Sequence, residues 1–459
     1  MTSATSTTRD PAGALSVRLR VGSGPGAGAT RPEETVDGPA PGGDVPAPAA
    51  PREIPDTGLE LEFLLNLMLK AMYVVGADRQ SRLVDHLKLV PAVVFDLMEE
   101  ARTRSLIQSL GAAAGGEVRY EPTARGRERA SEALAQSPYI GPAPVPLATY
   151  QEQVRRQGIR RENVDQKILQ ERLSHLVLSG DIEHQLGPAI NTGSAILLYG
   201  ESGNGKTSIA TAVARMFRDR IYIPYCLEVD GQIINIFDPT LHRARPADDG
   251  PSGRGVDQRW VACERPVILS GGELTLEMLD LNRDPVARVA EAPLQLKAAN
   301  GIFILDDFGR QIVQPQVMLN RWLLPLEYGV DYLSLRTGKK FPVPFDVLVI
   351  FSTNLPPHEL MDDAMMRRVP YKLAIRPPSP HEYAEIFDRV CAEHDLTLPD
   401  DVIPALLDDF YVRNGIRLAR YQPKFLVEHV LAICQFEEMP PRIDRELTVQ
   451  AARHLAVQG

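Results

Sequence analysis

The sequence predicts an α/β fold, in which helices lie on both faces of a parallel β-sheet. Three short apolar runs carry this prediction: Ala195–Tyr199, Gly301–Leu305 and Val347–Phe351, each followed by polar residues. Runs of this length without polar alternation are typical of strands buried on both faces, as they are in parallel sheets. The first run leads into a helical pattern through Ile209 and Val213, as a strand–helix unit requires.

Length and composition describe a globular protein of several structural units. The chain has 459 residues, of which 44% are hydrophobic and 24% are charged, as is usual for folded domains. Its net charge of −10 argues against a protein that coats nucleic acid, although a local basic patch stays compatible with it. Four widely spaced cysteines form no disulfide or metal pattern, and they predict reduced thiols in a cytosolic protein. They are Cys226, Cys263, Cys391 and Cys434.

No segment resembles an export signal or a membrane span. The N-terminus lacks an apolar stretch flanked by basic residues. The most apolar early stretch, Leu61–Val75, is interrupted by Glu62 and Lys70 and is too short to cross a bilayer. We therefore expect a cytoplasmic protein that does not contact a membrane.

Changes in composition divide the chain into five parts. Residues 1–52 contain mainly Ala, Gly, Pro, Ser and Thr, and we expect this tail to be disordered because it cannot form an apolar core. Residues 53–136 predict a small α+β unit, and the proline-rich residues 137–149 a stiff linker. Residues 150–378 predict the α/β core, beginning with a helical segment, and residues 379–459 predict a helical unit.

The unit at 53–136 predicts three helices, a hairpin and a closing helix. The expected elements are helices at Leu61–Met72, at Arg79–Leu87 and from Pro91, a hairpin of Ser105–Leu110 with Glu117–Glu121, and a helix capped by Thr123. This order resembles a winged-helix domain. The segment Tyr120–Arg127 resembles the stretch that follows the wing in MarR-like domains.

The charges of this unit bear on whether it binds DNA. Residues 52–136 contain 13 Asp or Glu and 11 Lys or Arg, and Asp96, Glu99 and Glu100 lie on the helix that would read bases. A base-reading helix normally presents Arg, Lys, Asn or Gln. We therefore favour a protein-contact module, with DNA binding as the alternative.

A glycine-rich loop directly follows the first strand and precedes a helix. Glycines allow successive backbone N–H groups to point inward at the positive end of a helix, where phosphate binds. Lys206 is expected to reach the β- and γ-phosphates, and the Thr207 hydroxyl to bind Mg²⁺. The loop therefore predicts binding of a nucleoside triphosphate. Its residues are Gly200, Glu201, Ser202, Gly203, Asn204, Gly205, Lys206 and Thr207.

Two acidic residues follow the second strand. Asp306 is predicted to hold Mg²⁺, directly or through water, as the strand-end aspartate does in P-loop nucleotidases. Asp307 stands where many such ATPases carry a glutamate that activates the attacking water. Aspartate is one methylene shorter, so either the geometry compensates or hydrolysis is slow.

Further features resemble the AAA+ superfamily of ATPases, and the resemblance covers about residues 190–456. Asn354, after the third strand, resembles the sensor 1 residue that orients the water and the γ-phosphate. An acidic helical segment ends in Arg367 and Arg368 just before Val369. This resembles the arginine finger that enters the ATP site of a neighbouring subunit. Arg368 fits the finger better, and Arg367 is the alternative.

The C-terminal residues resemble the small helical lid of the superfamily. In Tyr421–Leu426, Lys424 lies where the basic sensor 2 residue is expected, although arginine is usual there. Arg417 and Arg420 are nearby substitutes. Lysine lacks the planar fork of arginine, which weakens this assignment.

The resemblance implies a P-loop AAA+ core with a lid, and ATP and Mg²⁺ as cofactors. It further implies ATP hydrolysis by a ring, expected to be a hexamer, that remodels a protein client. The similarity is general, to bacterial MoxR-like and Clp-type members. One alternative is a DNA-directed loader or regulator that uses the winged helix. Another is a switch or scaffold with little turnover, which Asp307 and Lys424 would allow. A metabolic P-loop kinase would need neither Asn354 nor Arg368 nor a lid.

Other segments of the core carry weaker expectations. Residues 227–260 predict an insertion or surface loop, and the turn at 271–276 lies where threading motors place a pore loop, although their aromatic pattern is lacking. Arg310 and Arg321 are isolated, and we expect structural roles for them. The hairpin expected at 332–343 has a basic turn, Gly338–Lys340, which is a candidate substrate contact.

Overall fold

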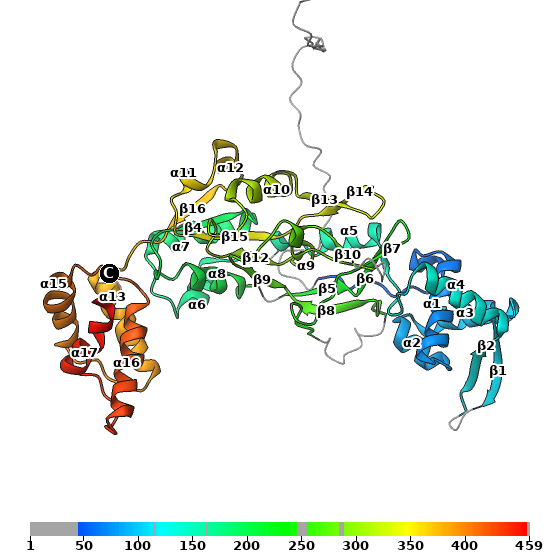
Figure 1. The fold of residues 1–459 in the computed structure, drawn as a ribbon, viewed down its shortest axis with the longest axis horizontal. Helices are drawn as coiled ribbons and strands as arrows, with labels where there is room; N and C mark the ends of the chain where they lie inside the picture. Colours follow the sequence, from blue (N-terminus) through cyan, green and yellow to red (C-terminus); the bar gives the residue numbers. More distant parts are fainter. Residues whose placement is uncertain are drawn as a thin grey trace, which may run out of the picture. The chain divides into compact units, whose positions relative to one another are not determined.

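The computed structural model describes residues 45–112, 116–161, 163–217, 219–245, 255–283 and 289–456, and Figure 1 shows the fold. Residues 1–44 of the tail that was predicted to be disordered lie outside the described residues. For residues 45–52 the prediction of disorder is wrong, because these residues pack against the core. Val45 is buried, the Gln153 side chain donates to the Pro46 carbonyl at 3.0 Å, and the Ala50 amide donates to the Gly255 carbonyl at 2.7 Å.

The N-terminal unit contains the predicted helices and hairpin in the predicted order. The hydroxyl of Thr123 caps the closing helix by accepting from the Gly126 amide at 3.1 Å. The assignment of this unit to the winged-helix class stays a prediction. The elements are η1 (Pro55–Thr57), α1 (Leu61–Lys70), η2 (Ala71–Val75), α2 (Gln80–Leu87), α3 (Pro91–Thr103), β1 (Ile107–Ala112), β2 (Val118–Pro122) and α4 (Ala124–Gln136).

The segment predicted as a stiff linker packs into the fold instead. Within it, β3 (Val145–Pro146) pairs in parallel with β6 (Cys226–Val229), and the side chains of Ala143 and Val145 are buried. Arg259, itself buried, donates to the Pro144 carbonyl at 3.1 Å. Proline richness could not predict this long-range pairing.

A parallel sheet of five strands forms the centre of the core, in the order β16-β4-β15-β12-β9. The predicted α/β class is thereby confirmed. The strand before the glycine-rich loop, β4, is separated from the strand before the two acids, β12, by β15 alone. The strands are β4 (Ile196–Tyr199), β9 (Val267–Ser270), β12 (Ile302–Leu305), β15 (Leu348–Thr353) and β16 (Tyr371–Ala374).

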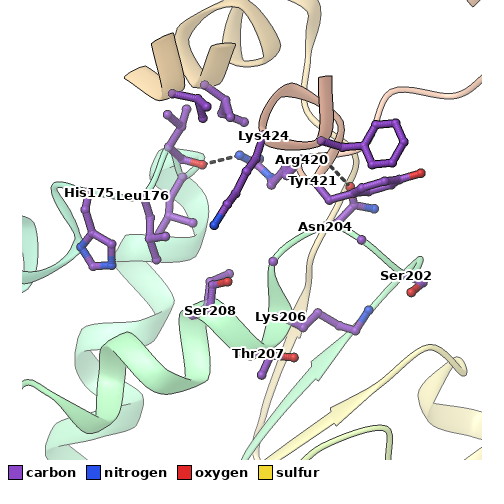
Figure 2. A pocket seen from close by; sticks show the side chains of 18 of the residues that line it. His175, Leu176, Ser202, Asn204, Lys206, Thr207, Ser208, Arg420, Tyr421 and Lys424 are labelled. Carbon is purple, nitrogen blue, oxygen red and sulfur yellow. Dashed lines mark hydrogen bonds between the residues drawn. The ribbon is translucent and has the colours of Figure 1, made fainter. Parts of the chain in front are cut away.

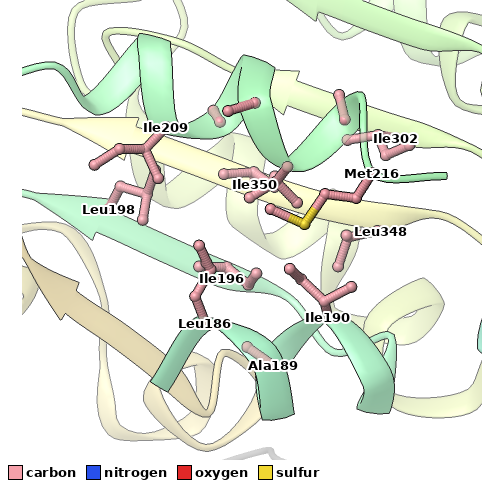
Figure 3. Close-up of a cluster of buried hydrophobic side chains, with 14 of the residues drawn as sticks. Leu186, Ala189, Ile190, Ile196, Leu198, Ile209, Met216, Ile302, Leu348 and Ile350 are labelled. Carbon is pink, nitrogen blue, oxygen red and sulfur yellow. The ribbon is translucent and has the colours of Figure 1, made fainter. Parts of the chain in front are cut away.

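Helices cover both faces of this sheet, and alternate strand residues point to each. Ile196, Ile302 and Ile350 contribute to a buried cluster with α7 (Gly180–Thr192) and α8 (Lys206–Ala214), and Figure 3 shows this cluster. Phe303 and Phe351 belong to a second cluster, with α10 (Pro315–Tyr328) and α12 (Asp363–Arg368). Burial on both faces explains why these strands read as continuous apolar runs.

The segment predicted to be helical before the core consists of several short helices. These are α5 (Leu147–Arg156), η3 (Ile159–Arg161), α6 (Gln166–Leu173) and α7 (Gly180–Thr192). The last begins after Ser179 and ends at Gly193, which has a left-handed conformation.

A second five-stranded sheet has the order β10-β11-β7-β6-β3, and its strands β6 and β7 lie in the region where the sequence predicted an insertion or surface loop. Its hydrophobic core also takes in β5 and β8, which pair with one another, and the hairpin of β13 and β14. The other elements of residues 150–378 are β5 (Arg220–Pro224), β7 (Gln232–Asn235), β8 (Trp260–Glu264), η5 (Glu277–Leu279), β10 (Asn282–Arg283), β11 (Val289–Glu291), α9 (Leu294–Lys297), β13 (Val330–Ser334), β14 (Lys340–Pro344) and α11 (Pro357–Leu360).

The C-terminal residues are helical, as predicted, with their own apolar core around Tyr383, Phe387 and Leu426. Ser379 opens the first helix through a capping box with Glu382. The helices are α13 (Pro380–Glu393), α14 (Val402–Pro404), η6 (Ala405–Tyr411), α15 (Val412–Asn414), α16 (Gln422–Phe436) and α17 (Arg445–Ala456). We call residues 379–456 the lid. Among the residues that the structure describes, no helix combines the length and apolarity that crossing a bilayer requires.

Phe303 tests how far the central sheet depends on its packing. This residue of β12 has a fully buried side chain that packs against Trp322 of α10, with ring centroids 5.2 Å apart. We expect Phe303→Ala to lower the free energy of unfolding of the core by about 3–5 kcal/mol, because it removes apolar contacts and leaves a cavity. Thermal melting followed by circular dichroism measures this. The matched change Phe436→Ala, at a side chain 88% exposed, should leave the melting temperature nearly unchanged.

Candidate nucleotide-binding site

A cavity of about 680 Å³ lies between the glycine-rich loop and the lid, and Figure 2 shows it from close by. Its walls come from both parts: the loop, the ends of β12 and β15, the segment 175–178, and helices α13 and α16. The lid contributes both apolar and charged side chains to the lining, and the charged ones are Arg389, Glu393, Arg420, Lys424 and Glu428. The apolar lining consists of Leu176, Val177, Leu178, Ile209, Ile386, Val390 and Phe425.

The glycine-rich loop has the backbone conformation that the sequence predicted for it. Gly200, Gly203 and Gly205 all have positive φ, of 142°, 78° and 84°, which side chains rarely allow. A Cβ atom on Gly200 would lie 2.3 Å from the Ile375 carbonyl oxygen. Gly205 then caps the N-terminus of α8. The loop therefore places backbone amides at a helix N-terminus, where anions bind.

The ammonium group of Lys206 lies at the base of the loop. It donates to the carbonyls of Gly200 and Glu201, both at 2.9 Å, and to Oδ1 of Asn354 at 2.7 Å. Burial lowers the pKa of Lys206, and the nearby carboxylates of Asp307 and Asp306 oppose this shift. Its three oxygen partners are of the kind that phosphate oxygens can replace.

Thr207 and the two acids meet directly beside this lysine. The Thr207 hydroxyl donates to Oδ2 of Asp306 at 2.8 Å, so the two predicted Mg²⁺ ligands are in contact. Asp307 has a left-handed backbone, with φ of 47°, which is uncommon for a residue other than glycine. The Asn354 amide donates to Oδ1 of Asp307 at 3.2 Å. Lys206, Asn354 and Asp307 thus form one hydrogen-bonded chain.

Gln311 supports this arrangement, although no sequence motif predicted it. Its Oε1 accepts from the Gly309 amide at 2.7 Å, and its Nε2 lies 3.4 Å from the Asp306 carbonyl and 3.5 Å from the Asp307 carbonyl. The side chain is buried. It therefore fixes the turn that holds both carboxylates, at a spacing that no motif marks.

The two predicted finger arginines lie on α12, and neither lines the cavity of its own chain. Arg368 Nε donates to Oε2 of Glu327 at 3.0 Å, and its Nη1 donates to the Ala364 carbonyl at 2.7 Å. Arg367 is exposed. The structure therefore separates both arginines from Asp307 and Asn354 of the same chain.

The lid contacts the loop through residues that precede Lys424. The Tyr421 amide donates to the Gly203 carbonyl at 3.0 Å, and Arg417 forms an ion pair with Glu201 at 2.6 Å. Arg420 is largely buried, where it donates to the Val177 carbonyl and its backbone amide donates to Asn204.

Lys424, by contrast, has a side chain 67% exposed, and its nearest charged partner is Glu428 at 3.9 Å. Both Arg420 and Lys424 line the cavity.

The arrangement fits a magnesium-bound nucleoside triphosphate. The loop amides and Lys206 can take the phosphates, and the paired oxygens of Thr207 and Asp306 are hard ligands of the kind Mg²⁺ prefers. Ser202 and Asn204 of the loop also line the cavity. The apolar side chains of segment 176–178 and of the lid suit a flat aromatic base.

Other sequence candidates have structural partners. Arg321 pairs with the buried Asp331 at 2.6 Å, as expected for a structural residue. The basic turn of the β13–β14 hairpin is less free than expected, because Lys339 pairs with Asp230 at 2.5 Å. Arg310 lies close enough to Lys206 to lower the pKa of that lysine. The four cysteines are free and buried.

Comparisons with known proteins reach only parts of the chain. Residues 379–454, most of the lid, match a family described as "Domain of unknown function (DUF8689)". No curated protein matches the sequence.

Among solved structures, the chain is similar to NtrX from Brucella abortus, with 14% identity over 60% of this chain and 55% of that one, at a TM-score of 0.37. It is also similar to the Holliday junction branch migration motor RuvB of Thermotoga maritima, with 12% identity over 66% of this chain and 73% of that one, at a TM-score of 0.32. The chain thus spans about half the length of NtrX. Likenesses this distant assign no function.

The fold and the site together have the order of elements predicted from the sequence, and membership of the AAA+ superfamily stays a prediction. A parallel sheet carries the glycine-rich loop after β4, the acids after β12 and Asn354 after β15, and a helical lid follows. The narrower similarity to MoxR-like or Clp-type members stays a prediction.

Proposed function

We propose that the chain is an ATPase that binds ATP and Mg²⁺ between the loop and the lid and works as a ring that remodels a protein client. One observation carries the nucleotide part of the proposal. Lys206, Thr207, Asp306, Asp307 and Asn354 come from three strand ends and join in one hydrogen-bonded group beside the cavity. A purely structural cluster would not need the anion-binding loop beside it.

Each residue of the group has a separate proposed role. The loop amides and Lys206 bind the phosphates, while Thr207 and Asp306 hold Mg²⁺, which would neutralise charge on the phosphates. Asp307 accepts a proton from the attacking water, and Asn354 orients that carboxylate through its amide. The left-handed backbone of Asp307 turns its short side chain toward Asn354, which offers one way for aspartate to serve in place of glutamate.

The arginines of α12 support the proposal of a ring. Because they do not line their own cavity, we propose that Arg368 or Arg367 completes the site of a neighbouring copy. A guanidinium supplied in this way stabilises charge on the transferred phosphoryl group, typically by about 10³-fold or more in rate. The ring, its expected six subunits and its client all belong to this proposal.

The charges of the N-terminal unit favour a protein client over DNA. Six of its arginines form ion pairs with carboxylates of the same unit, which leaves fewer cations for phosphates. They are Arg79, Arg82, Arg102, Arg104, Arg119 and Arg129. The exposed face of α3 presents Phe95 and Asp96, neither of which suits a base-reading helix. Duplex DNA binding at low salt would revive the DNA-directed alternative.

Arg420, rather than Lys424, is expected to couple the lid to the nucleotide. We expect Arg420→Ala to reduce ATP turnover about 10-fold or more, because a largely buried guanidinium at the cavity is lost. Lys424→Ala should reduce it less than about threefold, because its ammonium is mostly solvated. Steady-state phosphate release by both variants measures this. A larger loss in the Lys424 variant would restore the assignment made from the sequence.

The dependence of the rate on protein concentration tests the whole proposal. ATP hydrolysis per chain should rise with protein concentration and level off as copies associate. Arg368→Ala or Arg367→Ala should remove that rise while ATP binding persists. A rate per chain that is constant over a thousandfold range of concentration would exclude the ring, and no ATP binding at all would exclude the ATPase.

A further inference from the structure

Helix α10 presents an exposed apolar stripe to solvent. Val317, Leu324 and Tyr328 are 43%, 53% and 68% exposed, and their spacing of seven and four residues places them on one face of the helix. The opposite face, with Met318 and Trp322, packs against the central sheet. The stripe is therefore not needed to hold α10 in place.

This stripe lies beside the arginine-bearing helix α12. The Gln316 side chain donates to Oδ2 of Asp362, the N-cap of α12, at 3.2 Å. Toward the other end of α10, Glu327 accepts from Arg368 Nε at 3.0 Å. Figure 1 shows the two helices next to each other. The stripe and the end of α12 thus belong to one surface.

Glu327 links the two parts of that surface. In sequence it lies three residues after Leu324 and directly before Tyr328, so its carboxylate emerges at the border of the stripe. Its ion pair with Arg368 is partly exposed, with side chains 37% and 24% accessible. Partly solvated pairs are weak and exchange readily. Anything that covers Leu324 and Tyr328 therefore changes the surroundings of this pair.

We propose that the stripe of α10 is the surface on which a second copy of this chain docks, and that Glu327 holds Arg368 until that copy is bound. This rests on the proposed function, in which an arginine of α12 enters a neighbour's site. A second copy is the occupant that fits, because the arginines beside the stripe do not line the nucleotide cavity of their own chain and a copy brings such a cavity with it. The contact is head-to-tail, since stripe and cavity are different surfaces.

Apolar and aromatic anchors of this kind dominate the energetics of many interfaces. The double variant Leu324→Ser/Tyr328→Ser should therefore weaken self-association about 10-fold or more, measured by sedimentation velocity with Mg²⁺ and a non-hydrolysable ATP analogue. The matched control is Tyr73→Ser/Leu110→Ser, at side chains of the same types in the N-terminal unit that are 48% and 51% exposed. It should associate like the wild type. Equal melting temperatures for both double variants exclude misfolding.

The outcomes separate this inference from the proposed function. If the wild type hydrolyses ATP in a concentration-dependent way but the stripe variant associates normally, the inference is wrong and the proposed function stands. If the stripe variant associates normally but loses stimulation by a client protein, the stripe binds the client and the inference is equally overturned. If the wild type neither binds nor hydrolyses ATP, the proposed function is wrong. In that case, self-association of the wild type and of the stripe variant, measured without nucleotide, tests the docking surface independently of the proposed function.

The holding role of Glu327 has its own test. Glu327→Gln removes the ion pair but keeps the size of the side chain. At protein concentrations below half-saturation, we expect about a two- to threefold higher rate of ATP hydrolysis per chain, because Arg368 no longer has to exchange partners. Arg368→Ala should lower the rate under the same conditions. If Glu327→Gln lowers the rate as Arg368→Ala does, the carboxylate positions the arginine instead of withholding it, and this part is overturned.

Discussion

Lys206→Ala will weaken ATP binding about 100-fold or more. Lys206 lies at the base of the loop, where its ammonium is proposed to donate to the β- and γ-phosphates, and a hydrogen bond made by a charged group typically contributes about 1.5–3 kcal/mol. The variant loses the only ammonium that reaches this position among the described residues. Its removal also leaves Oδ1 of Asn354 without its donor. Titration of a fluorescent ATP analogue, followed by anisotropy, measures the change.

The control for this change is Lys340→Ala. Lys340 is an exposed lysine on β14 that does not line the cavity, so ATP affinity should stay within about twofold of the wild type. Both variants should melt at nearly the wild-type temperature, because Lys206 caps carbonyls of a loop and not a core. Tight ATP binding by Lys206→Ala would place the nucleotide elsewhere on the chain.

Asp307→Asn will keep ATP bound and slow its hydrolysis about 100- to 1,000-fold. Asparagine has nearly the same shape and can still accept from the Asn354 amide. It cannot take up a proton, and general-base catalysis typically contributes about this factor. Single-turnover hydrolysis, measured with enzyme in excess over ATP, isolates the chemical step from product release.

A matched control is Asp400→Asn, at an exposed aspartate in the lid. Its rate should equal that of the wild type. If Asp307→Asn hydrolyses ATP at the wild-type rate, Asp307 does not activate water. A wild-type rate that is itself negligible would instead favour the switch or scaffold.

The parts of the fold that the sequence predicted are those specified by local patterns. Ala195–Tyr199, Gly301–Leu305 and Val347–Phe351 are apolar throughout because both faces of their strands are buried, and all three became strands of one sheet. The glycines of the loop are specified by backbone conformation, as the positive φ of Gly203 shows. Since parallel strands share a carboxyl edge, the meeting of Asp306 with Thr207 also followed from the strand assignments.

The parts that it missed depend on contacts between distant residues. The second sheet contains β3 and β10, strands of two residues each, which have no periodicity to detect. Residues 45–52 were predicted to be disordered because they contain few large apolar groups. Val45 nevertheless packs into a hydrophobic core that is formed mainly by other elements. The pairing of Glu327 with Arg368 joins two helices whose sequences carry no sign of it.

Mixing two inactive variants tests directly whether a neighbouring copy completes the nucleotide site, as we propose. Lys206→Ala lacks the phosphate-binding lysine but keeps its arginines, while Arg367→Ala/Arg368→Ala keeps the lysine and lacks them. Each alone should hydrolyse almost no ATP. In an equal mixture, roughly a quarter of the interfaces of a head-to-tail ring combine an intact lysine with intact arginines. The mixture should recover a corresponding part of the wild-type rate; a mixture as inactive as its components would show that no neighbouring copy completes the site.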